Sequence, residues 1–418
     1  MNNSESDVNK LRATVHVPGS KSLSQRALVA AALAEGDSFI GNVLVSQDIL
    51  YLIEGLRELG VKITAVEDGY YVCGTAGKLT KNEKKLFLGN NGTALRFLTA
   101  LVCLGTGKYV LTGEKRLCER PVGALADALK EMGVDIMTHN DCPPVEINAN
   151  GLSGGKITLR DIESSQYVSA LLLCAPYTRK GIDLKIEGEV VSAPYIELTI
   201  RVMRDFGAGI DEKTKNQYHV RTGEIYHGCK YVVEGDASSA SYFFLAAALL
   251  KKTINVEGIN RQSRQGDIRL LDILEKMGCT VKSGQNRVEV TGGGLAKGDF
   301  TFDLNDMPDM VPTLAVLSAF REGRTIIENV AHLRIKESNR LAAIVAELNR
   351  VGIEACELPK GLMIQGGKPN PASIETYNDH RMAMSFAIAG LVQPGIDIRD
   401  KKCVDKSFPS FWDELKKI

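Results

Sequence analysis

The sequence predicts a mixed α/β protein made of six repeated units in two groups of three. Three observations support this. A polar cluster that opens onto small apolar residues recurs about every 70 residues, a helix that ends at glycine recurs in phase with it, and the two ends of the chain complement each other. Repetition of a whole supersecondary unit implies a common architecture for all six units.

The polar clusters open the units. They begin near Ser20, Asn90, Ser164, Asp236, Asp309 and Asp379. The following runs, such as ALVAAALA from Ala27 and TLAVLSAF from Thr313, are too uniformly apolar for solvent-facing helices and predict buried ones. A buried helix directs its unpaired N-terminal amides and the positive end of its dipole toward its mouth. Six such mouths favour a large site for anions.

Amphipathic helices form the second repeated signal. Five stretches, among them IEGLRELGVKI and LADALKEMGVDI, begin as amphipathic helices. The helices end at Gly60, Gly133, Gly207, Gly278 and Gly352. Glycine just past a helix end is the usual left-handed cap, and a β-type segment follows each one. One unit therefore contains a buried helix, a strand, an amphipathic helix and further strands.

The ends of the chain fix the grouping. The chain begins with a strand-like segment, LRATVHVPGS, and ends on a helix-like segment, FPSFWDELKKI, so the sixth unit lacks its closing strand. We expect the N-terminal strand to complete the C-terminal group. This predicts one domain at 20–232 and another at 1–19 plus 233–418, joined by two crossings that permit closure around a ligand.

Composition excludes several classes of protein. The 51 basic and 51 acidic side chains give a formal net charge of zero, which argues against a dedicated nucleic-acid binder. The polar N-terminus predicts no signal peptide, and no apolar stretch reaches membrane-spanning length. Nine cysteines without a C-x-x-C pair favour reduced thiols in a cytoplasmic protein.

Cations lie at the N-terminal ends of predicted helices, where the dipole disfavours them. They are Lys21 and Arg26, Arg120 before a Pro121 suited to the first helical position, Lys336 and Arg340 in the first turns of one helix, His380 and Arg381, and Lys406. Any one of them alone fits a solvated surface cation. Together they predict unneutralised cations that gather around a multiply charged anion, with Ser20, Ser22, Ser164, Ser165, Ser192, Asn90 and Thr93 as neutral donors.

Two carboxylates stand among the cations. Asp309 lies at the mouth of the fifth buried helix, and Glu337 lies between Lys336 and Arg340. Asp309 could simply cap its helix, and Glu337 could pair with Arg340. Two carboxylates in different surroundings also suit acid–base chemistry. The sequence contains no P-loop, no Rossmann fingerprint and no metal-ligand cluster.

These residues fall within motifs that resemble the 5-enolpyruvylshikimate-3-phosphate synthase family. The motifs run in order from Gly19 to Lys406 and include GSKSLSQRAL, GNNGTALRFL, LTGEKRLCERPVGALADAL, SSQYVSALLL, VSAPYIELT, EGDASSASYF, LRIKESNR and NDHRMAM. The resemblance implies two domains, each of three βαβαββ units, with the active site in the cleft between them. It also implies a monomer that needs no metal or organic cofactor, and it implies transfer of the enolpyruvyl group of phosphoenolpyruvate to the 5-hydroxyl of shikimate 3-phosphate.

The resemblance also implies roles for residues. Those that resemble the shikimate 3-phosphate site are Lys21, Ser22, Arg26, Ser164, Ser165, Gln166, Ser192, Tyr195, Asp309 and Lys336. Those that resemble the phosphoenolpyruvate site are Lys21, Asn90, Gly92, Arg120, Gln166, Arg340, His380, Arg381 and Lys406. We assign Asp309 to the hydroxyl proton and Glu337, with Lys21, to the methylene proton.

Two positions depart from the family pattern. His332 stands where many members carry Asn, and Cys118 stands near Arg120 where several relatives carry Lys. Cys118 raises an alternative, UDP-N-acetylglucosamine enolpyruvyl transferase, which has the same architecture and a catalytic cysteine in the corresponding loop. A second alternative is an anion-binding protein without turnover, which would need the cations but not both carboxylates.

Overall fold

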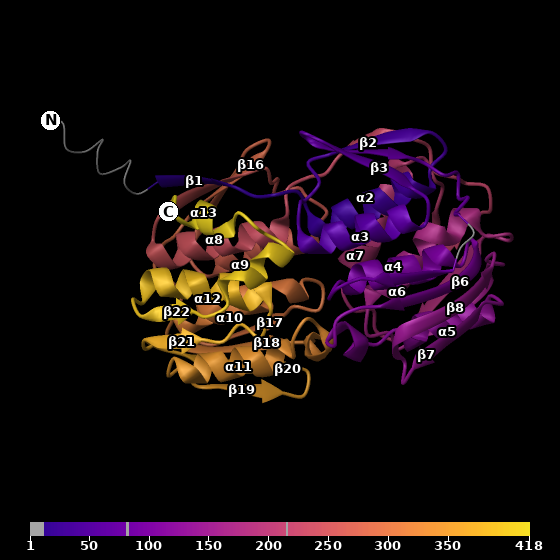
Figure 1. Ribbon diagram of the computed structural model, residues 1–418. Coiled ribbons are helices and arrows are strands. Elements are labelled where there is room, and N and C mark those ends of the chain that lie inside the picture. The colour runs from indigo at the N-terminus through magenta and orange to yellow at the C-terminus, as the bar shows by residue number, and fades with distance from the viewer. Residues whose placement is uncertain (1–11, 81–82, 215) are drawn as a thin grey trace. The chain divides into compact units, whose positions relative to one another are not determined.

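The computed structural model describes residues 12–80, 83–214 and 216–418, which form two compact units. Unit 1 holds the N-terminal segment up to Gly19 together with Glu234–Ile418, and unit 2 holds Ser20–Val233 (Figure 1). Buried apolar side chains form one core cluster in each unit. The polar N-terminal stretch, from which we predict no signal peptide, falls within residues 1–11, which lie outside the described residues.

The sheets of unit 2 share one strand order, in which two parallel strands are followed by two antiparallel ones. The first sheet is β13 (Lys230–Val232), β2 (Asp37–Gly41), β4 (Gly69–Cys73) and β3 (Lys62–Val66). The second is β5 (Lys84–Phe87), β6 (Thr106–Thr112), β8 (Cys142–Asn150) and β7 (Asp135–His139). The third is β9 (Gly155–Arg160), β10 (Ile182–Glu187), β12 (Gln217–Val220) and β11 (Asp211–Thr214).

Unit 1 repeats the same order twice. Its first sheet is β1 (Arg12–His16), β14 (Thr253–Glu257), β16 (Arg287–Thr291) and β15 (Thr280–Ser283). Its second is β17 (Phe300–Asp303), β18 (Gly323–Glu328), β20 (Gly361–Gly366) and β19 (Ala355–Leu358). The sixth repeat has the parallel pair alone, β21 (Ala372–Ile374) with β22 (Ile396–Ile398). Burial alternates along strands such as β8 and β16, so one face of each of their sheets packs on the core.

Two strands each belong to a different unit from the helix that follows them in the sequence. Strand β1 precedes the first buried helix, yet it pairs in parallel with β14 of unit 1, with Arg12 opposite Thr253. Strand β13 precedes the fourth buried helix, yet it pairs with β2 of unit 2. The chain therefore crosses between units twice, and a bridge between Gly19 and Gly235 joins the two crossing segments.

Helices fill the space between the sheets. The buried ones are α2 (Lys21–Leu33), α4 (Gly92–Val102) and α6 (Ser165–Cys174) in unit 2, and α8 (Ala237–Leu250), α10 (Val311–Ala319) and α12 (His380–Val392) in unit 1. Each set of three packs together, as Figure 1 shows for α8, α10 and α12. All six begin within one or two residues of the predicted polar clusters, so the buried helices are confirmed.

The second helix of each repeat lies outside the buried set. These helices are α3 (Gln47–Glu58), α5 (Gly123–Glu131), α7 (Pro194–Asp205), α9 (Leu270–Lys276), α11 (Arg340–Arg350) and the short α13 (Phe411–Leu415). The five predicted glycine caps have φ between 77° and 96°, the left-handed conformation that only glycine adopts without strain. Short 3-10 turns are η1 (Leu117–Glu119), η2 (Ala175–Tyr177), η3 (Gly266–Arg269), η4 (Pro308–Met310), η5 (Ala331–Ile335) and η6 (Lys401–Lys406).

Two predicted helix starts are wrong. Helix α5 begins at Gly123, so Pro121 lies before the helix. Its carbonyl accepts hydrogen bonds from Arg96 (2.8 Å) and from the hydroxyl of Tyr167 (2.8 Å). Helix α11 begins at Arg340 and is capped by the Asn339 side chain, so Lys336 is extended rather than helical.

Across the described ranges, every helix is too short or too polar to cross a membrane. The same residues contain no group of three or more His, Cys, Asp or Glu side chains that could hold a metal ion.

Candidate functional site

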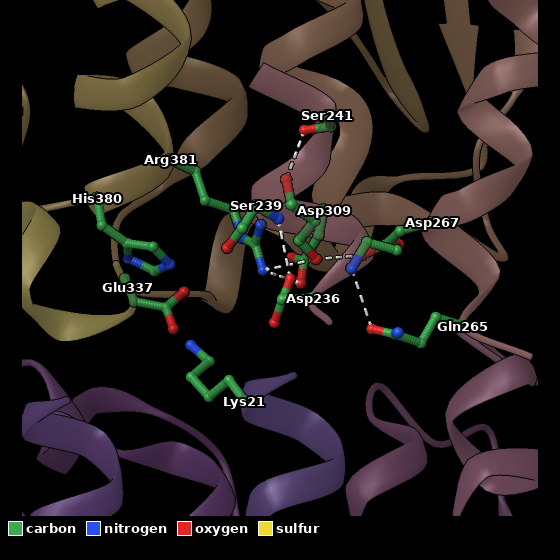
Figure 2. A network of polar contacts seen from close by, with 12 residues as sticks. Lys21, Asp236, Ser239, Ser241, Gln265, Asp267, Asp309, Glu337, His380 and Arg381 are labelled. Atoms are coloured by element: carbon green, nitrogen blue, oxygen red, sulfur yellow. Dashed lines mark hydrogen bonds and ion pairs between the residues drawn. The ribbon is translucent and has the colours of Figure 1, made fainter. Parts of the chain in front are cut away.

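The candidate site of unit 1 lies where the N-terminal ends of its three buried helices meet. Asp309 in η4, just before α10, contacts two arginines: its Oδ1 lies 2.9 Å from Arg340 Nη1 and its Oδ2 lies 2.6 Å from Arg381 Nη2. Arg381 belongs to the first turn of α12 and also donates to the hydroxyl of Ser238 in the first turn of α8, at 3.4 Å. The three helices thus start from one polar cluster (Figure 2).

Arg340 is surrounded by carboxylates. Besides Asp309, its guanidinium contacts Glu337 Oε2 at 2.6 Å and Asp379 Oδ2 at 2.8 Å, and its side chain is 1% exposed. Burial lowers the pKa of Arg340, but the charges of Asp379, Glu337 and Asp309 outweigh burial and raise it. Asp379 also caps α12 by accepting from the backbone N–H of Arg381 at 3.0 Å.

The prediction that the clustered cations are unneutralised is wrong. Arg340 and Arg381 pair with carboxylates of their own unit, and in unit 2 Lys21 Nζ lies 3.2 Å from Asp48 Oδ2. The physical reason is burial, because a charge removed from water without a partner costs several kcal/mol. The protein supplies carboxylate partners for Lys21, Arg340 and Arg381, and an anionic ligand of these three cations must compete with those carboxylates.

The same pairs govern the basicity of Asp309. Burial raises the pKa of its carboxyl, but Arg381, Arg340 and Lys336 together hold that pKa well below its usual range. Asp309 is therefore ionised at neutral pH. The proposed capping role does not apply to Asp309, since Met310 stands at the cap position of α10 and no side-chain hydrogen bond is formed there.

His332 lies near this cluster in η5 and is buried, with an exposed fraction of 8%. Burial, helped by the charge of Lys336, lowers its pKa to about 3, so the imidazole is neutral at pH 7. Its Nε2 has no hydrogen-bond partner among the described residues. His380 is also buried, with Nδ1 3.8 Å from Asp379 Oδ1, and Lys406 ends η6, which packs against α12.

The candidate site of unit 2 is centred on Gly92 at the start of α4. A Cβ at Gly92 would lie 2.7 Å from the guanidinium carbon of Arg120 and 2.6 Å from Arg96 Nη1. Arg96 donates to Gln166 Oε1 at 2.8 Å, and Arg120 Nη1 lies 3.5 Å from the carbonyl of Asn90. The structure therefore brings three predicted residues, Asn90, Arg120 and Gln166, together around the predicted Gly92.

Arg26, which we predict to belong to the shikimate 3-phosphate site, is buried among partners of its own unit. It is 1% exposed and donates to Thr199 Oγ1 (2.7 Å) and to the carbonyls of Ser22 (2.8 Å) and Tyr195 (3.1 Å). Burial lowers its pKa to about 10. These contacts tie α2 to α7, so Arg26 contributes to the packing of the predicted ligand residues around it.

The serines of unit 2 lie at helix starts. Ser164 caps α6, its hydroxyl accepting from Gln166 N at 3.3 Å, and Ser165 is the first residue of that helix. Ser192 precedes α7 with φ 58°, a left-handed conformation that costs a non-glycine residue roughly 1–2 kcal/mol. Strain of this kind concentrates at functional sites.

Sequence reasoning missed several members of these clusters. They are Asp48, Arg96, Asp379 and Asp267, which accepts a hydrogen bond from the Ser238 hydroxyl. Asp379 could have been found, because it is the second residue of the NDHRMAM motif, and Arg96 could have been found as the cation inside the apolar run ALRFLTAL. Asp48 and Asp267 carry no local signal, since each is a single acid in an ordinary polar stretch.

Comparison with known proteins identifies the family. A sequence profile described as EPSP synthase (3-phosphoshikimate 1-carboxyvinyltransferase) matches residues 6–415. The chain belongs to the EPSP synthase family. A protein of this family from Trichormus variabilis, named 3-phosphoshikimate 1-carboxyvinyltransferase, is 42% identical over 97% of this chain and 96% of its own length. A protein of the same name from Yersinia ruckeri is 41% identical over 98% of this chain and 96% of its own length.

Solved EPSP synthases have the same fold. A structure of EPSP synthase from Acinetobacter baumannii aligns with a TM-score of 0.79 and 28% identity, over 97% of this chain and 95% of that one. The predicted α/β fold and the resemblance to this family are thereby confirmed. The alternative suggested by Cys118 is not favoured, since the relatives above are shikimate enzymes by name. The Cys118 thiol contacts the carbonyl of Gly113 at 3.7 Å.

Proposed function

We propose that this EPSP synthase family member transfers the enolpyruvyl group of phosphoenolpyruvate to the 5-hydroxyl of shikimate 3-phosphate and releases phosphate. The reaction supplies chorismate and aromatic amino-acid biosynthesis. The single observation that supports it most is the contact of Asp309 with both Arg340 and Arg381, at 2.9 and 2.6 Å. The carboxylate of Asp309 can act as a base, and the two arginines beside it can bind an anion.

Ligand binding changes the chemistry of that contact. Phosphoenolpyruvate carries a phosphate and a carboxylate, and both suit the planar guanidinium fork. An anion that occupies Arg340 or Arg381 weakens their hold on Asp309, which raises the pKa of that carboxyl. Asp309 therefore becomes a stronger base when substrate is bound, as general base catalysis requires.

The residues divide by ligand. We assign shikimate 3-phosphate to Lys21, Ser22, Ser164, Ser165, Gln166, Ser192, Tyr195, Asp309 and Lys336, with Arg26 supporting them from the interior. We assign phosphoenolpyruvate to Lys21, Asn90, Gly92, Arg120, Gln166, Arg340, His380, Arg381 and Lys406. In this assignment both units contribute cations. We propose that the two units correspond to the predicted domains 20–232 and 1–19 plus 233–418.

The reaction proceeds by addition and elimination. Asp309 takes the proton of the 5-hydroxyl as its oxygen bonds to C2 of phosphoenolpyruvate, and Glu337 with Lys21 delivers a proton to the methylene carbon. The tetrahedral intermediate then loses a proton from the methyl group, the C2–O bond to phosphate breaks, and the C=C bond re-forms to give the enol ether product. Each proton transfer contributes about 10²–10⁴ in rate. We expect the chain to act as a cytoplasmic monomer.

Phosphate release tests this proposal. Purified protein with phosphoenolpyruvate is offered shikimate 3-phosphate, UDP-N-acetylglucosamine or no acceptor, and inorganic phosphate is followed with time. We expect release only with shikimate 3-phosphate. Phosphate release with UDP-N-acetylglucosamine instead would show that the chain has the alternative activity. Binding of phosphoenolpyruvate and shikimate 3-phosphate without phosphate release would indicate a non-catalytic binding protein.

A further inference from the structure

A buried carboxylate of unit 1 has no role in the chemistry described above. Asp267 lies in η3, is 4% exposed, and accepts a hydrogen bond from the Ser238 hydroxyl in the first turn of α8. The neighbouring Gln265 fixes the same turn, because its side chain accepts from Ala237 N at 3.2 Å and donates to the carbonyl of Gly235 at 2.7 Å. The segment before α9 is thus anchored to the start of α8.

Ser238 connects this carboxylate to the candidate site. Nη2 of Arg381 lies 3.4 Å from the Ser238 hydroxyl and 2.6 Å from Asp309 Oδ2. A chain of side chains therefore runs from Asp267 through Ser238 and Arg381 to Asp309. One guanidinium stands between two carboxyl groups, one in direct contact and one reached through a hydroxyl.

The two carboxyl groups differ in how readily they lose a proton. Burial, followed by the charge of Asp309, raises the pKa of Asp267 to about 7, although Arg381 and Ser238 oppose the rise. Asp236, before α8, acts in the same direction as Asp309. Asp309 itself is held ionised by its two arginines. Such a pair, with pKa values pushed apart by different surroundings, is typical of acid–base sites.

Other charged groups on the elements packed against η3 face elsewhere. Arg269 of η3 pairs with Asp306 at 3.2 Å on the surface. The α9 acids Asp272 and Glu275 both bind Arg261, at 2.8 and 2.6 Å. The charges of Asp309, Arg381 and Asp236 act on Asp267 from within the cluster.

We propose that Asp267 is a positioning residue for enolpyruvyl transfer, which sets the position of the Arg381 guanidinium between the hydroxyl of Ser238 and Asp309. The inference rests on the proposed function. An ionised Asp267 attracts Arg381 toward Ser238 and weakens its hold on Asp309, so Asp309 becomes a stronger base. A protonated Asp267 leaves the charge of Arg381 to Asp309 alone, and Asp309 becomes a weaker base. Turnover should therefore rise as Asp267 loses its proton.

Asp267→Asn tests the role, because asparagine keeps the shape and the acceptor for Ser238 but cannot ionise. We expect kcat at pH 8 to fall about tenfold, since a one-unit change in the pKa of a general base changes the rate by at most about that factor. The rise of kcat through neutral pH should disappear, and the KM for shikimate 3-phosphate should stay within about twofold of wild type. Ser238→Ala, which keeps Asp267, should have the same effects.

The double variant and a matched control complete the test. If Asp267 acts through Ser238, Asp267→Asn combined with Ser238→Ala is no slower than the slower single variant. Ser241→Ala removes another buried hydroxyl of α8, one that donates to the carbonyl of Ser238 at 2.6 Å, and should keep the wild-type pH profile. Thermal unfolding of each variant reports whether it folds, and Ser238→Ala carries the test if Asp267→Asn does not fold.

The outcomes separate the two levels of argument. An active wild type whose Asp267→Asn and Ser238→Ala variants keep its kcat and pH profile overturns the positioning role and leaves the proposed function intact. The same conclusion follows if both variants lose thermal stability without a change in profile. A wild type that releases no phosphate with shikimate 3-phosphate refutes the proposed function, and the positioning role with it.

Discussion

Gly92→Ala is the substitution whose effect can be worked out most directly from the geometry. The added methyl carbon would lie 2.7 Å from Cζ and Nη2 of Arg120 and 2.6 Å from Arg96 Nη1. Ordinary contact between such atoms is about 3.5–4.0 Å, so the Arg120 guanidinium must move by roughly 1 Å. Alanine is the better helix former, so the fold itself should not suffer.

The cost falls on anion binding. A charge-assisted hydrogen bond contributes about 1.5–3 kcal/mol, and its loss corresponds to roughly a 10- to 150-fold change in affinity. We expect the KM for phosphoenolpyruvate to rise by about tenfold or more. The KM for shikimate 3-phosphate and the melting temperature should stay near wild type.

Steady-state phosphate release, with each substrate varied in turn, gives both constants. Glyphosate provides a second readout, since we expect it to compete with phosphoenolpyruvate and to inhibit the variant less. The reasoning is refuted if Gly92→Ala keeps the wild-type KM for phosphoenolpyruvate and equal sensitivity to glyphosate. Thr99→Ala, further along the same helix, is the comparison for a general disturbance of α4, because the Thr99 hydroxyl donates only to the Leu95 carbonyl at 2.7 Å among the described contacts.

Two further substitutions address the carboxylate cluster. Asp309→Ala should keep ligand binding by calorimetry but lower kcat by about 10²–10⁴, and unchanged turnover would remove Asp309 from the chemistry. His332→Asn should change the pH dependence of stability. Because folding lowers the pKa of His332 from 6.5 to about 3, wild type loses stability as the pH falls below about 6.5, by roughly 2 kcal/mol at pH 5. The variant should therefore gain in melting temperature relative to wild type at pH 5 compared with pH 8, and an equal difference at both would contradict the burial of a neutral imidazole.

Much of the fold could be predicted because the same pattern, a polar cluster followed by an apolar run, occurs six times in the sequence. Apolar runs after polar clusters indicate buried helices, and glycines such as Gly60 mark helix ends by a backbone conformation that other residues resist. The first residues of helices were less predictable where side chains form hydrogen bonds with backbone groups near the helix start. Asn339 caps α11 and leaves Lys336 outside the helix, and two donors hold the Pro121 carbonyl before α5.

The site could be predicted in part only. Cations and carboxylates at helix starts identified Asp309, Arg340 and Arg381, which the structure joins. Which charges neutralise one another depends on contacts far apart in sequence, such as Lys21 with Asp48 and Arg340 with Asp379. No local pattern encodes these pairs, so the sequence suggested free cations where the fold supplies partners.

The central claim is that cations of both units bind one substrate, and kcat/KM for phosphoenolpyruvate with saturating shikimate 3-phosphate tests it most directly. Lys21→Met removes a cation of unit 2 and Arg381→Met removes one of unit 1, while Lys130→Met and Arg324→Met remove exposed cations as controls. We predict a loss of about tenfold or more for each of the first two, which is the value of one charged hydrogen bond, and none for the controls. Wild-type kcat/KM in either Lys21→Met or Arg381→Met would contradict the account.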